Sequence, residues 1–321
     1  MRALVLDETG VTLRTDAPEP VPGDGEVLVR VTRAGICETD LQLMRGYMGF
    51  RGVLGHEFVG VAQDGPFEGL RVVSDINCSC AICPTCLSGR PTHCPNRTVL
   101  GILNHDGAFA DYIAVPQSNL HVVPDEITTD EAVFTEPLAA AYQIPAQLHI
   151  RRKDHIVVLG DGRLGNLCAQ VLHGLSNHVT VVGKHPQKLA LLSALGIKTT
   201  LLGAAPPEPT ADYVVDCTGS ESGLTTALKY VRPRGTVVLK TTVAGTQTLA
   251  LAPIVIDEVT IVGSRCGPFD QALQALQAGE VSVLPLIASR FDLSEGVAAL
   301  QEAASKPVLK ILLDAEATLE E

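Results

Sequence analysis

The sequence predicts an α/β protein with two domains, the first rich in β-strands and the second built on a doubly wound parallel sheet. A length of 321 residues is enough for two domains, each with its own core. Residues 1–148 consist mainly of short β-like segments, such as 26–32 and 69–74, separated by Gly/Pro turns. From about His149, apolar runs of four to six residues alternate with helix-like stretches, a pattern typical of βαβ units.

The elements of the second half alternate between strand and helix. Short apolar runs predict buried strands at 156–159, 179–182, 213–215, 236–239 and 260–262. Helix-like stretches are expected at 163–174, 269–278 and 294–304, and a final strand at 308–313. By order of succession the strand at 259–263 forms an edge of the sheet, and an exposed apolar edge is usually covered or paired. We therefore expect a homo-oligomer, either a homodimer or a homotetramer.

The composition argues against several classes of partner. The net charge of −12 would repel a phosphate backbone, and no basic stripe offsets it, so a nucleic-acid partner is not expected. The first residues lack the apolar stretch and cleavage site of a signal peptide, and no apolar run approaches the roughly 18 residues of a membrane span. These features predict a cytoplasmic protein with no membrane partner, in which clustered cysteines are more often metal ligands than disulfides.

Four cysteines follow the spacing C-x2-C-x2-C-x7-C, namely Cys80, Cys83, Cys86 and Cys94. Tight turns among them can close a four-thiolate tetrahedral shell on Zn²⁺ with no open position. The alternatives are disulfides, which conflict with the expected compartment, or an iron–sulfur cluster, whose spacings usually differ. The spacing therefore predicts a structural zinc site, with Cys78 as a surplus cysteine.

Three other fragments offer a different set of ligands. Cys37 has the hydroxyl of Thr39 two residues on, His56 is followed by Glu57, and Glu136 supplies a further carboxylate. Three protein ligands drawn from Cys, His and Glu, with a water or substrate oxygen, form the shell of a catalytic zinc. Each fragment alone is a weak signal.

Together with the cysteine cluster, the fragments GICETD, GHEFVG and TEPLA resemble the zinc-dependent medium-chain dehydrogenase/reductase superfamily, in its alcohol, sorbitol and threonine dehydrogenase branch. The resemblance runs through to the closing segment KPVLKILL. It implies a GroES-like zinc-binding catalytic domain at 1–148 and 269–321, with a Rossmann NAD(P)-binding domain at 149–268. It also implies one catalytic and one structural zinc per subunit.

The resemblance also implies roles for individual residues. Cys37 and His56 become zinc ligands, Glu57 a carboxylate that can enter or leave the shell, and Glu136 the glutamate near the metal. Asp40 matches the carboxylate that orients the zinc-bound imidazole. Thr39 matches the hydroxyl that passes the proton of the substrate.

Two positions depart from the pattern of the family. Gln42 stands where many members have a histidine and cannot titrate, so the proton must leave by another route, such as water or His105. Glu38 stands where some alcohol dehydrogenases place an arginine against the cofactor pyrophosphate, a role that an acid cannot fill.

The segment 156–165 is an apolar run followed by the glycine pattern G-x-G-x-x-G and the start of a helix. In this context Gly160 allows the tight turn, Gly162 lets the backbone approach a pyrophosphate, and Gly165 lets the helix pack on the strand. The helix start at Arg163 and Leu164 would stabilise the phosphate charge. The pattern predicts a dinucleotide site.

The second strand ends in Gly183, Lys184 and His185, without the carboxylate that NAD sites usually have there. A small residue followed by cations suits the 2′-phosphate of NADP, so NADP is the favoured cofactor and NAD the alternative.

The expected function is zinc-dependent hydride transfer between NAD(P) and an alcohol or polyol, or an aldehyde or ketone. One alternative is a zinc-free enoyl or quinone reductase of the same superfamily, which would lack the metal ligands. The other is a non-catalytic NADPH-binding protein that retains the fold.

Overall fold

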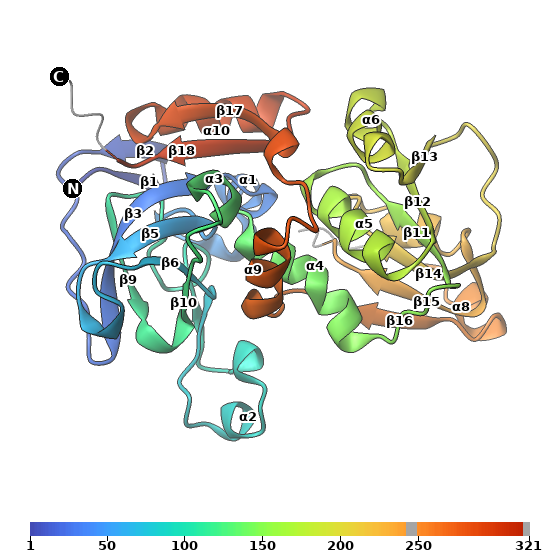
Figure 1. Ribbon diagram of the computed structural model, residues 1–321, viewed down its shortest axis with the longest axis horizontal. Helices are drawn as coiled ribbons and strands as arrows, with labels where there is room; N and C mark the ends of the chain where they lie inside the picture. Colours follow the sequence, from blue (N-terminus) through green and yellow to red (C-terminus); the bar gives the residue numbers. More distant parts are fainter. Residues whose placement is uncertain (242–248, 317–321) are drawn as a thin grey trace. The chain divides into compact units, whose positions relative to one another are not determined.

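The computed structural model describes residues 1–241 and 249–316 and confirms the predicted fold class, a β-rich part and a parallel α/β sheet (Figure 1). The chain forms two compact units. The first contains Met1–Glu136, Ala272–Ala278 and the segment from Leu286 onward, and the second contains Pro137–Gln271 and Gly279–Pro285. The predicted domain boundaries stay a prediction, because α4 (Thr135–Gln147) and α9 (Phe269–Gln277) are each shared between the two units.

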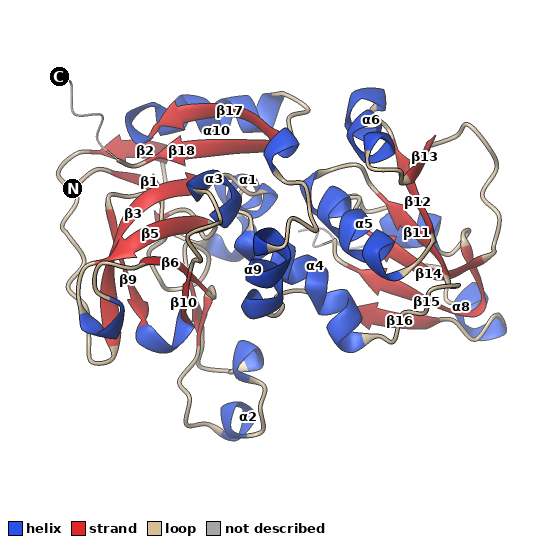
Figure 2. Cartoon of the chain, viewed as in Figure 1, coloured by secondary structure: helices blue, strands red, loops and turns tan. Residues whose placement is uncertain are grey.

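The first unit is built on β-sheets, which Figure 2 shows in red. One sheet has the order β2-β1-β4, formed by Gly10–Arg14, Ala3–Asp7 and Gly52–Val53. A larger sheet has the order β10-β6-β5-β3-β18-β17, formed by Leu120–Val122, Arg71–Ser74, Phe58–Ala62, Glu26–Gly35, Lys310–Asp314 and Ile287–Asp292. β9 (Tyr112–Pro116) also pairs with β3, and β7 (Asn77–Cys78) pairs with β8 (Thr98–Val99).

Strand β3 ends at Gly35, two residues before Cys37. Val27, Val29 and Val31 are buried and alternate with less buried residues, the period of two that a strand with one face on the core requires. β18 joins β3 antiparallel with Leu312 opposite Gly35, so the last described strand of the chain reaches the end of β3. The final strand predicted at 308–313 is thereby confirmed as an element, although β17 was not expected.

Helices are short up to residue 134, whereas the expectation of mainly β-like segments over 1–148 is wrong for 135–147, which form the 13-residue helix α4. The short helices are α1 (Glu38–Met44), α2 (Pro84–Leu87) and α3 (Thr129–Ala132), with 3-10 turns at Tyr47–Gly49, Gly65–Phe67, Pro91–His93 and Gln117–Asn119. α10 (Gly296–Ser305) lies near the predicted helix 294–304 and follows a 3-10 turn at Leu293–Glu295, and another such turn lies at Leu284–Leu286. Thr128 and Glu131 cap α3 reciprocally, which satisfies backbone donors at its start.

The second unit contains a six-stranded parallel sheet in the order β13-β12-β11-β14-β15-β16. The strands are Lys198–Leu201, His178–Gly183, His155–Leu159, Ala211–Asp216, Val231–Leu239 and Thr260–Gly263. This is the order of a dinucleotide-binding sheet, with the reversal point between β11 and β14. The helices are α5 (Arg163–Leu175), α6 (Pro186–Ala194), α7 (Gly223–Ala227) and α8 (Ala252–Ile256).

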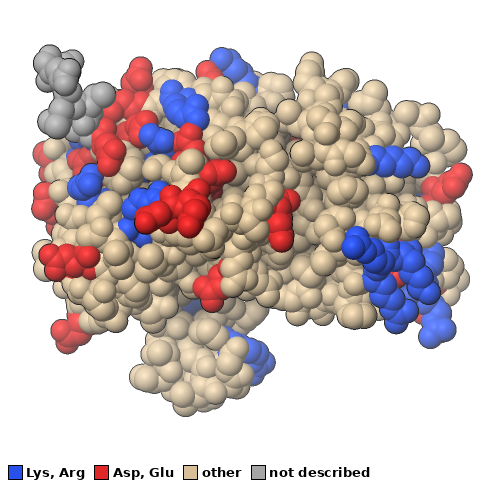
Figure 3. Space-filling model, viewed as in Figure 1, with Lys and Arg blue, Asp and Glu red and all other residues tan. Residues whose placement is uncertain are grey.

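All five apolar runs of the second half form strands of this sheet, and β16 lies at its edge as predicted. β13 was missed because its sequence, KTTL, is half exposed and lacks an apolar run. Charged side chains are unevenly distributed. On the face shown in Figure 3, acidic side chains lie mainly over the first unit and basic ones gather at one end of the second.

Among the described residues, no helix combines the length and apolar character needed to cross a membrane. All nine cysteines lie in the described residues and are free thiols.

Candidate active site

Cys37 lies where β3 gives way to α1. The residue is the N-cap of α1, in extended backbone conformation, and its N–H donates to Asp40 Oδ2 at 2.8 Å. Gly35, at the end of β3, has no room for a side chain, since a Cβ there would lie 2.8 Å from Val133 Cγ1 and 3.1 Å from Glu57 Oε2. The glycine therefore lets the end of β3 approach the carboxylate of Glu57.

His56 and Glu57 lie on the turn that leads into β5. Gly55 has a φ of +98°, and a Cβ there would lie 2.3 Å from the ring of Phe109. Only glycine fits this conformation and this space. The turn buries both polar side chains, with His56 3% and Glu57 1% exposed.

The ligand atoms of Cys37, His56 and Glu57 lie within 4.8 Å of one another. His56 Nδ1 faces Asp40 Oδ1 at 3.3 Å, and both atoms are buried without a well-directed hydrogen bond. Burial lowers the pKa of His56, but the charges of Asp40 and Cys37 outweigh it and raise that pKa well above its usual value. A metal at the other ring nitrogen would fix a proton on Nδ1 for Asp40 to accept, so these residues fit a zinc ion.

Thr39 and Glu136, which were also predicted as site residues, are not among the three grouped ligand residues. Thr39 Oγ1 is 3.8 Å from Cys37 Sγ. Glu136, at the start of α4, is not in the group of ligand atoms within 4.8 Å. Burial raises the pKa of Glu136 to about 7; the charge of His56 opposes this shift and that of Glu57 adds to it. In this arrangement the ligand atom that lies with those of Cys37 and His56 belongs to Glu57.

The two departures from the family pattern interact with each other. Gln42 Nε2 donates to Glu38 Oε1 at 3.0 Å, one turn apart on the exposed side of α1. The Gln42 amide is therefore engaged with a surface carboxylate.

Lys310 is a site residue that the sequence reasoning missed. Its ammonium group forms an ion pair with Glu57 Oε2, and both side chains are 1% exposed. It also lies 3.5 Å from the Ile36 carbonyl oxygen and 5.5 Å from the centroid of the Phe134 ring. The sequence could have indicated this residue, because a lysine precedes three apolar residues in the strand KILLD. A buried lysine usually has a charged partner.

The four cysteines of the expected structural zinc site also lie together, with all four Sγ atoms within 4.8 Å of one another. Cys83 is the N-cap of α2, and its Sγ is 3.5 Å from Cys86 and 3.8 Å from Cys94. Backbone N–H groups of Ile82 and Cys83 lower the pKa of Cys80 to about 6, which favours a thiolate ligand. Cys78 is outside this group, and burial raises its pKa to about 12.

The glycine-rich turn between β11 and α5 has the geometry that a dinucleotide site needs. Gly160 has a φ of +109°, and a Cβ there would lie 2.5 Å from the Cys217 carbonyl oxygen. Gly162 is the N-cap of α5 and has open space around it, whereas a Cβ on Gly165 would lie 2.2 Å from the Gly160 carbonyl oxygen. Arg163 and Leu164 form the first turn of α5. These residues leave room for a pyrophosphate at the helix start.

The end of β12 differs from the sequence expectation in one respect. Gly183, Lys184 and His185 lie there as predicted, but a carboxylate is also present, because Asp161 reaches across from the glycine-rich turn. NADP was expected because no carboxylate follows β12 in the sequence. Since the Asp161 carboxylate lies there, the end of β12 no longer favours NADP over NAD.

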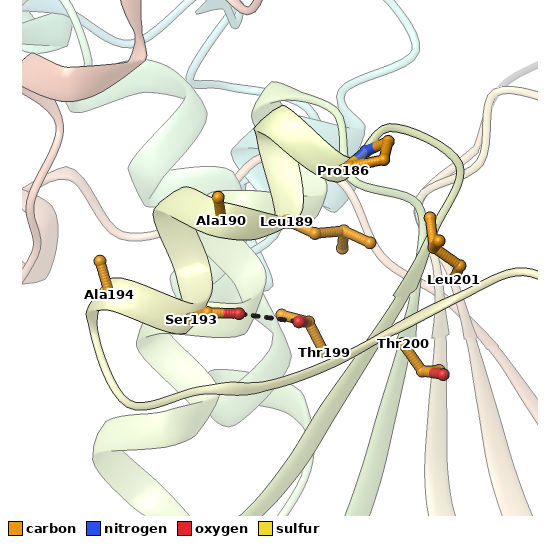
Figure 4. A pocket seen from close by; sticks show the side chains of 8 residues that line it. All are labelled: Pro186, Leu189, Ala190, Ser193, Ala194, Thr199, Thr200 and Leu201. Carbon is orange, nitrogen blue, oxygen red and sulfur yellow. Dashed lines mark hydrogen bonds between the residues drawn. The ribbon is translucent and has the colours of Figure 1, made fainter. Parts of the chain in front are cut away.

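A surface hollow elsewhere on the second unit has no comparable chemistry. It lies over α6 and β13, and its lining contains no titratable side chain (Figure 4). Its one internal polar contact joins Ser193 Oγ and Thr199 Oγ1 at 2.8 Å.

Comparisons with known proteins identify a family for both parts of the chain. Residues 23–125 match the alcohol dehydrogenase GroES-like domain, and residues 164–279 match the zinc-binding dehydrogenase family. A probable zinc-binding alcohol dehydrogenase from Mycobacterium tuberculosis is 34% identical over 262 residues, which cover 74% of this chain and 67% of that protein. The sorbitol dehydrogenase of Halalkalibacterium halodurans is 28% identical over 98% of this chain and 99% of its own length.

A solved structure shows the same fold over the whole chain. It is a zinc-binding dehydrogenase from Sinorhizobium meliloti bound to NADP, with a TM-score of 0.88, 26% identity and 98% coverage of each chain. The fold and the two cysteine-containing sites define a zinc-dependent oxidoreductase that uses NAD(P). The chain belongs to the zinc-dependent medium-chain dehydrogenase/reductase superfamily.

Proposed function

We propose that this chain transfers a hydride between NAD(P) and a small alcohol or polyol, or the corresponding aldehyde or ketone, at a zinc held by Cys37, His56 and a glutamate. The observation that carries the proposal is the group of half-buried Cys37 with buried His56 and Glu57, in which the Asp40 carboxylate lies 3.3 Å from the imidazole. An exchangeable metal site of this composition suits catalysis, because it leaves a coordination position for the substrate oxygen.

When bound, zinc would supply Lewis acidity at the substrate oxygen and the nicotinamide would supply or accept the hydride. The residues of the chain provide the rest. The Asp40 carboxylate lies beside the His56 ring and would orient it once a metal binds the other nitrogen, and Lys310 forms an ion pair with Glu57. The Thr39 hydroxyl is positioned to exchange the proton of the substrate.

A second group of ligand atoms supports a second zinc ion per subunit, which Cys80, Cys83, Cys86 and Cys94 would hold. Four thiolates leave no position for a substrate, so this site has a structural role. Four thiolate ligands require reduced cysteines, which a reducing compartment favours, and we place the protein in the cytoplasm on this ground.

A turnover screen tests the function. Polyols, sugars, amino alcohols and aldehydes are supplied with NADH, NADPH and their oxidised forms, and absorbance of the reduced nicotinamide is followed. The polyol arm is supported by the sorbitol dehydrogenase of Halalkalibacterium halodurans. We expect turnover that a chelator abolishes and added zinc restores. Turnover that persists without metal would instead favour a zinc-free reductase.

We also propose that β16 pairs with a second copy of this chain. The strand is the edge of the sheet, and its Ile261 is 36% exposed. The neighbouring α8 exposes Val255 by 73% and Ile256 by 77%, which gives the edge an apolar border that suits burial in an interface.

Sedimentation at micromolar concentration should therefore show a dimer or a tetramer. The double variant Val255→Asp, Ile256→Asp should shift the protein toward the monomer, because it places charges in the interface. A change of Val21→Asp is the control, because Val21 is also exposed, at 88%, but lies in the first unit. A monomeric wild-type protein would contradict the proposal.

A further inference from the structure

The carboxylate of Asp161 lies at the end of β12, although the residue belongs to the glycine-rich turn after β11. Its Oδ2 accepts the backbone N–H groups of Lys184 at 2.7 Å and His185 at 2.6 Å. Its Oδ1 lies 3.0 Å from His185 Nδ1. The side chain is 7% exposed, so it is largely buried by these partners.

The topology explains how a residue of the first turn reaches the second strand. β11 and β12 are parallel neighbours with Leu159 opposite Val182, so the residues that follow them emerge side by side (Figure 1). A Cβ at Gly183 would lie 2.5 Å from Asp161 Oδ2. The Asp161 carboxylate thus occupies the position that a side chain on residue 183 would take, which is possible because that residue is a glycine.

This space has a defined role in dinucleotide-binding sheets. A carboxylate at the end of the second strand accepts the ribose 2′-hydroxyl of NAD, whereas NADP sites place cations there for the 2′-phosphate. Burial raises the pKa of Asp161, but the hydrogen bonds from His185 and Lys184 outweigh it and lower that pKa below its usual value. The group is therefore an anion at neutral pH.

We propose that Asp161 is the cofactor-selecting residue of this chain and that the chain binds NAD(H) in preference to NADP(H). This inference rests on the proposed nicotinamide-dependent function. Asp161 acts in two ways. Its negative charge repels a 2′-phosphate, and it already takes the backbone N–H groups of Lys184 and His185 and the His185 ring nitrogen.

The carboxylate retains capacity for a ribose hydroxyl. Two carboxylate oxygens offer about four acceptor positions. Oδ2 accepts two backbone N–H groups, while Oδ1 has a single partner within 3.0 Å, the His185 ring. One acceptor position on Oδ1 therefore remains for the 2′-hydroxyl.

The test is a binding titration of NADH and NADPH to the full-length protein, followed by nicotinamide fluorescence and by calorimetry. A charge-assisted contact changes affinity by roughly tenfold to a hundredfold, so wild-type protein should bind NADH at least about tenfold more tightly. Asp161→Asn keeps the size of the side chain and removes its charge. It should strengthen NADPH binding by about tenfold or more and weaken NADH binding, because the charge-assisted contact to the ribose hydroxyl is lost.

Two control variants separate this effect from simpler ones. Asp212→Asn removes a carboxylate that accepts the His155 N–H at 2.8 Å at the amino end of the same sheet, and it should leave the ratio of the two affinities unchanged. Lys184→Ala should also leave the ratio unchanged, whereas it would weaken NADPH alone if Lys184 bound a 2′-phosphate.

Equal or tighter NADPH binding by the wild-type protein would overturn the inference while leaving the proposed function intact. An Asp161→Asn variant that loses both cofactors in proportion would also overturn it, because the residue would then only shape the turn. Binding of neither cofactor to the wild-type protein would overturn both the inference and the proposed function. The wild-type ratio decides the matter even if the variant fails to fold.

Discussion

Replacing Cys37 with serine should lower turnover by about a thousandfold or more while leaving the fold intact. Cys37 is the only thiolate in the group with His56 and Glu57, and a hydroxyl is a poor substitute for it as a zinc ligand. Lewis-acid stabilisation by a bound metal contributes several kcal/mol, which corresponds to a factor of this size. The measurements are kcat, zinc content by elemental analysis and the thermal unfolding midpoint. We expect two zinc ions per subunit in the wild-type protein and one in the variant.

Cys83→Ser is the matched control, since it removes one thiolate from the other group. It should also lower the zinc content to one per subunit, but its main effect should be a reduced unfolding midpoint, because structural zinc contributes directly to folding. Turnover at low temperature should persist. If both variants lost only stability, the assignment of the catalytic zinc to Cys37 would be wrong.

In the zinc-free protein, Lys310→Met should destabilise the folded state by about 3–5 kcal/mol. The variant removes one partner of an ion pair whose side chains are both 1% exposed, and it leaves the Glu57 carboxylate buried without its counter-charge. Denaturant unfolding monitored by circular dichroism gives the change in the free energy of unfolding. The double variant Lys310→Met, Glu57→Gln should recover part of the loss, because it removes the second charge as well.

Lys306→Met provides the comparison. Lys306 pairs with Glu302 at 2.8 Å one turn away on α10, but the two side chains are 60% and 23% exposed. An exposed pair of this kind contributes about 0.3–0.5 kcal/mol. Equal losses from the two lysine variants would show that the pair beneath the metal site is solvated in the folded protein.

Most residues of the candidate site could be predicted from sequence motifs, because each motif consists of residues that are close in sequence and fold together. The glycine-rich turn, the Cys37 N-cap and the four-cysteine loop are formed by residues close in sequence, so their geometry follows from their spacing. The strands of the second unit were equally accessible, since buried parallel strands have continuous apolar runs. β13, with its polar edge sequence, shows where that signal fails.

The residues that were missed act across long sequence separations. Lys310 lies 253 residues from Glu57, and only the pairing of β18 with β3 brings the two together. Asp161 lies 23 residues from Lys184, and the parallel pairing of β11 with β12 is needed to place them side by side. A motif cannot show such contacts, because the partner is chosen by the sheet topology and not by spacing.

The pairing of β3 with β18 also has a consequence for biosynthesis. The sheet that carries Cys37 cannot be completed before residues 310–314 have been synthesised, although β3 itself emerges among the first 35 residues. Most of the second unit, Pro137–Gln271, is continuous in sequence, so its parallel sheet is available to fold while the ribosome is still working. The later unit along the chain therefore matures before the earlier one. During that interval Arg33, Ala34 and Gly35 at the end of β3 lack the strand β18 that pairs with them in the complete fold.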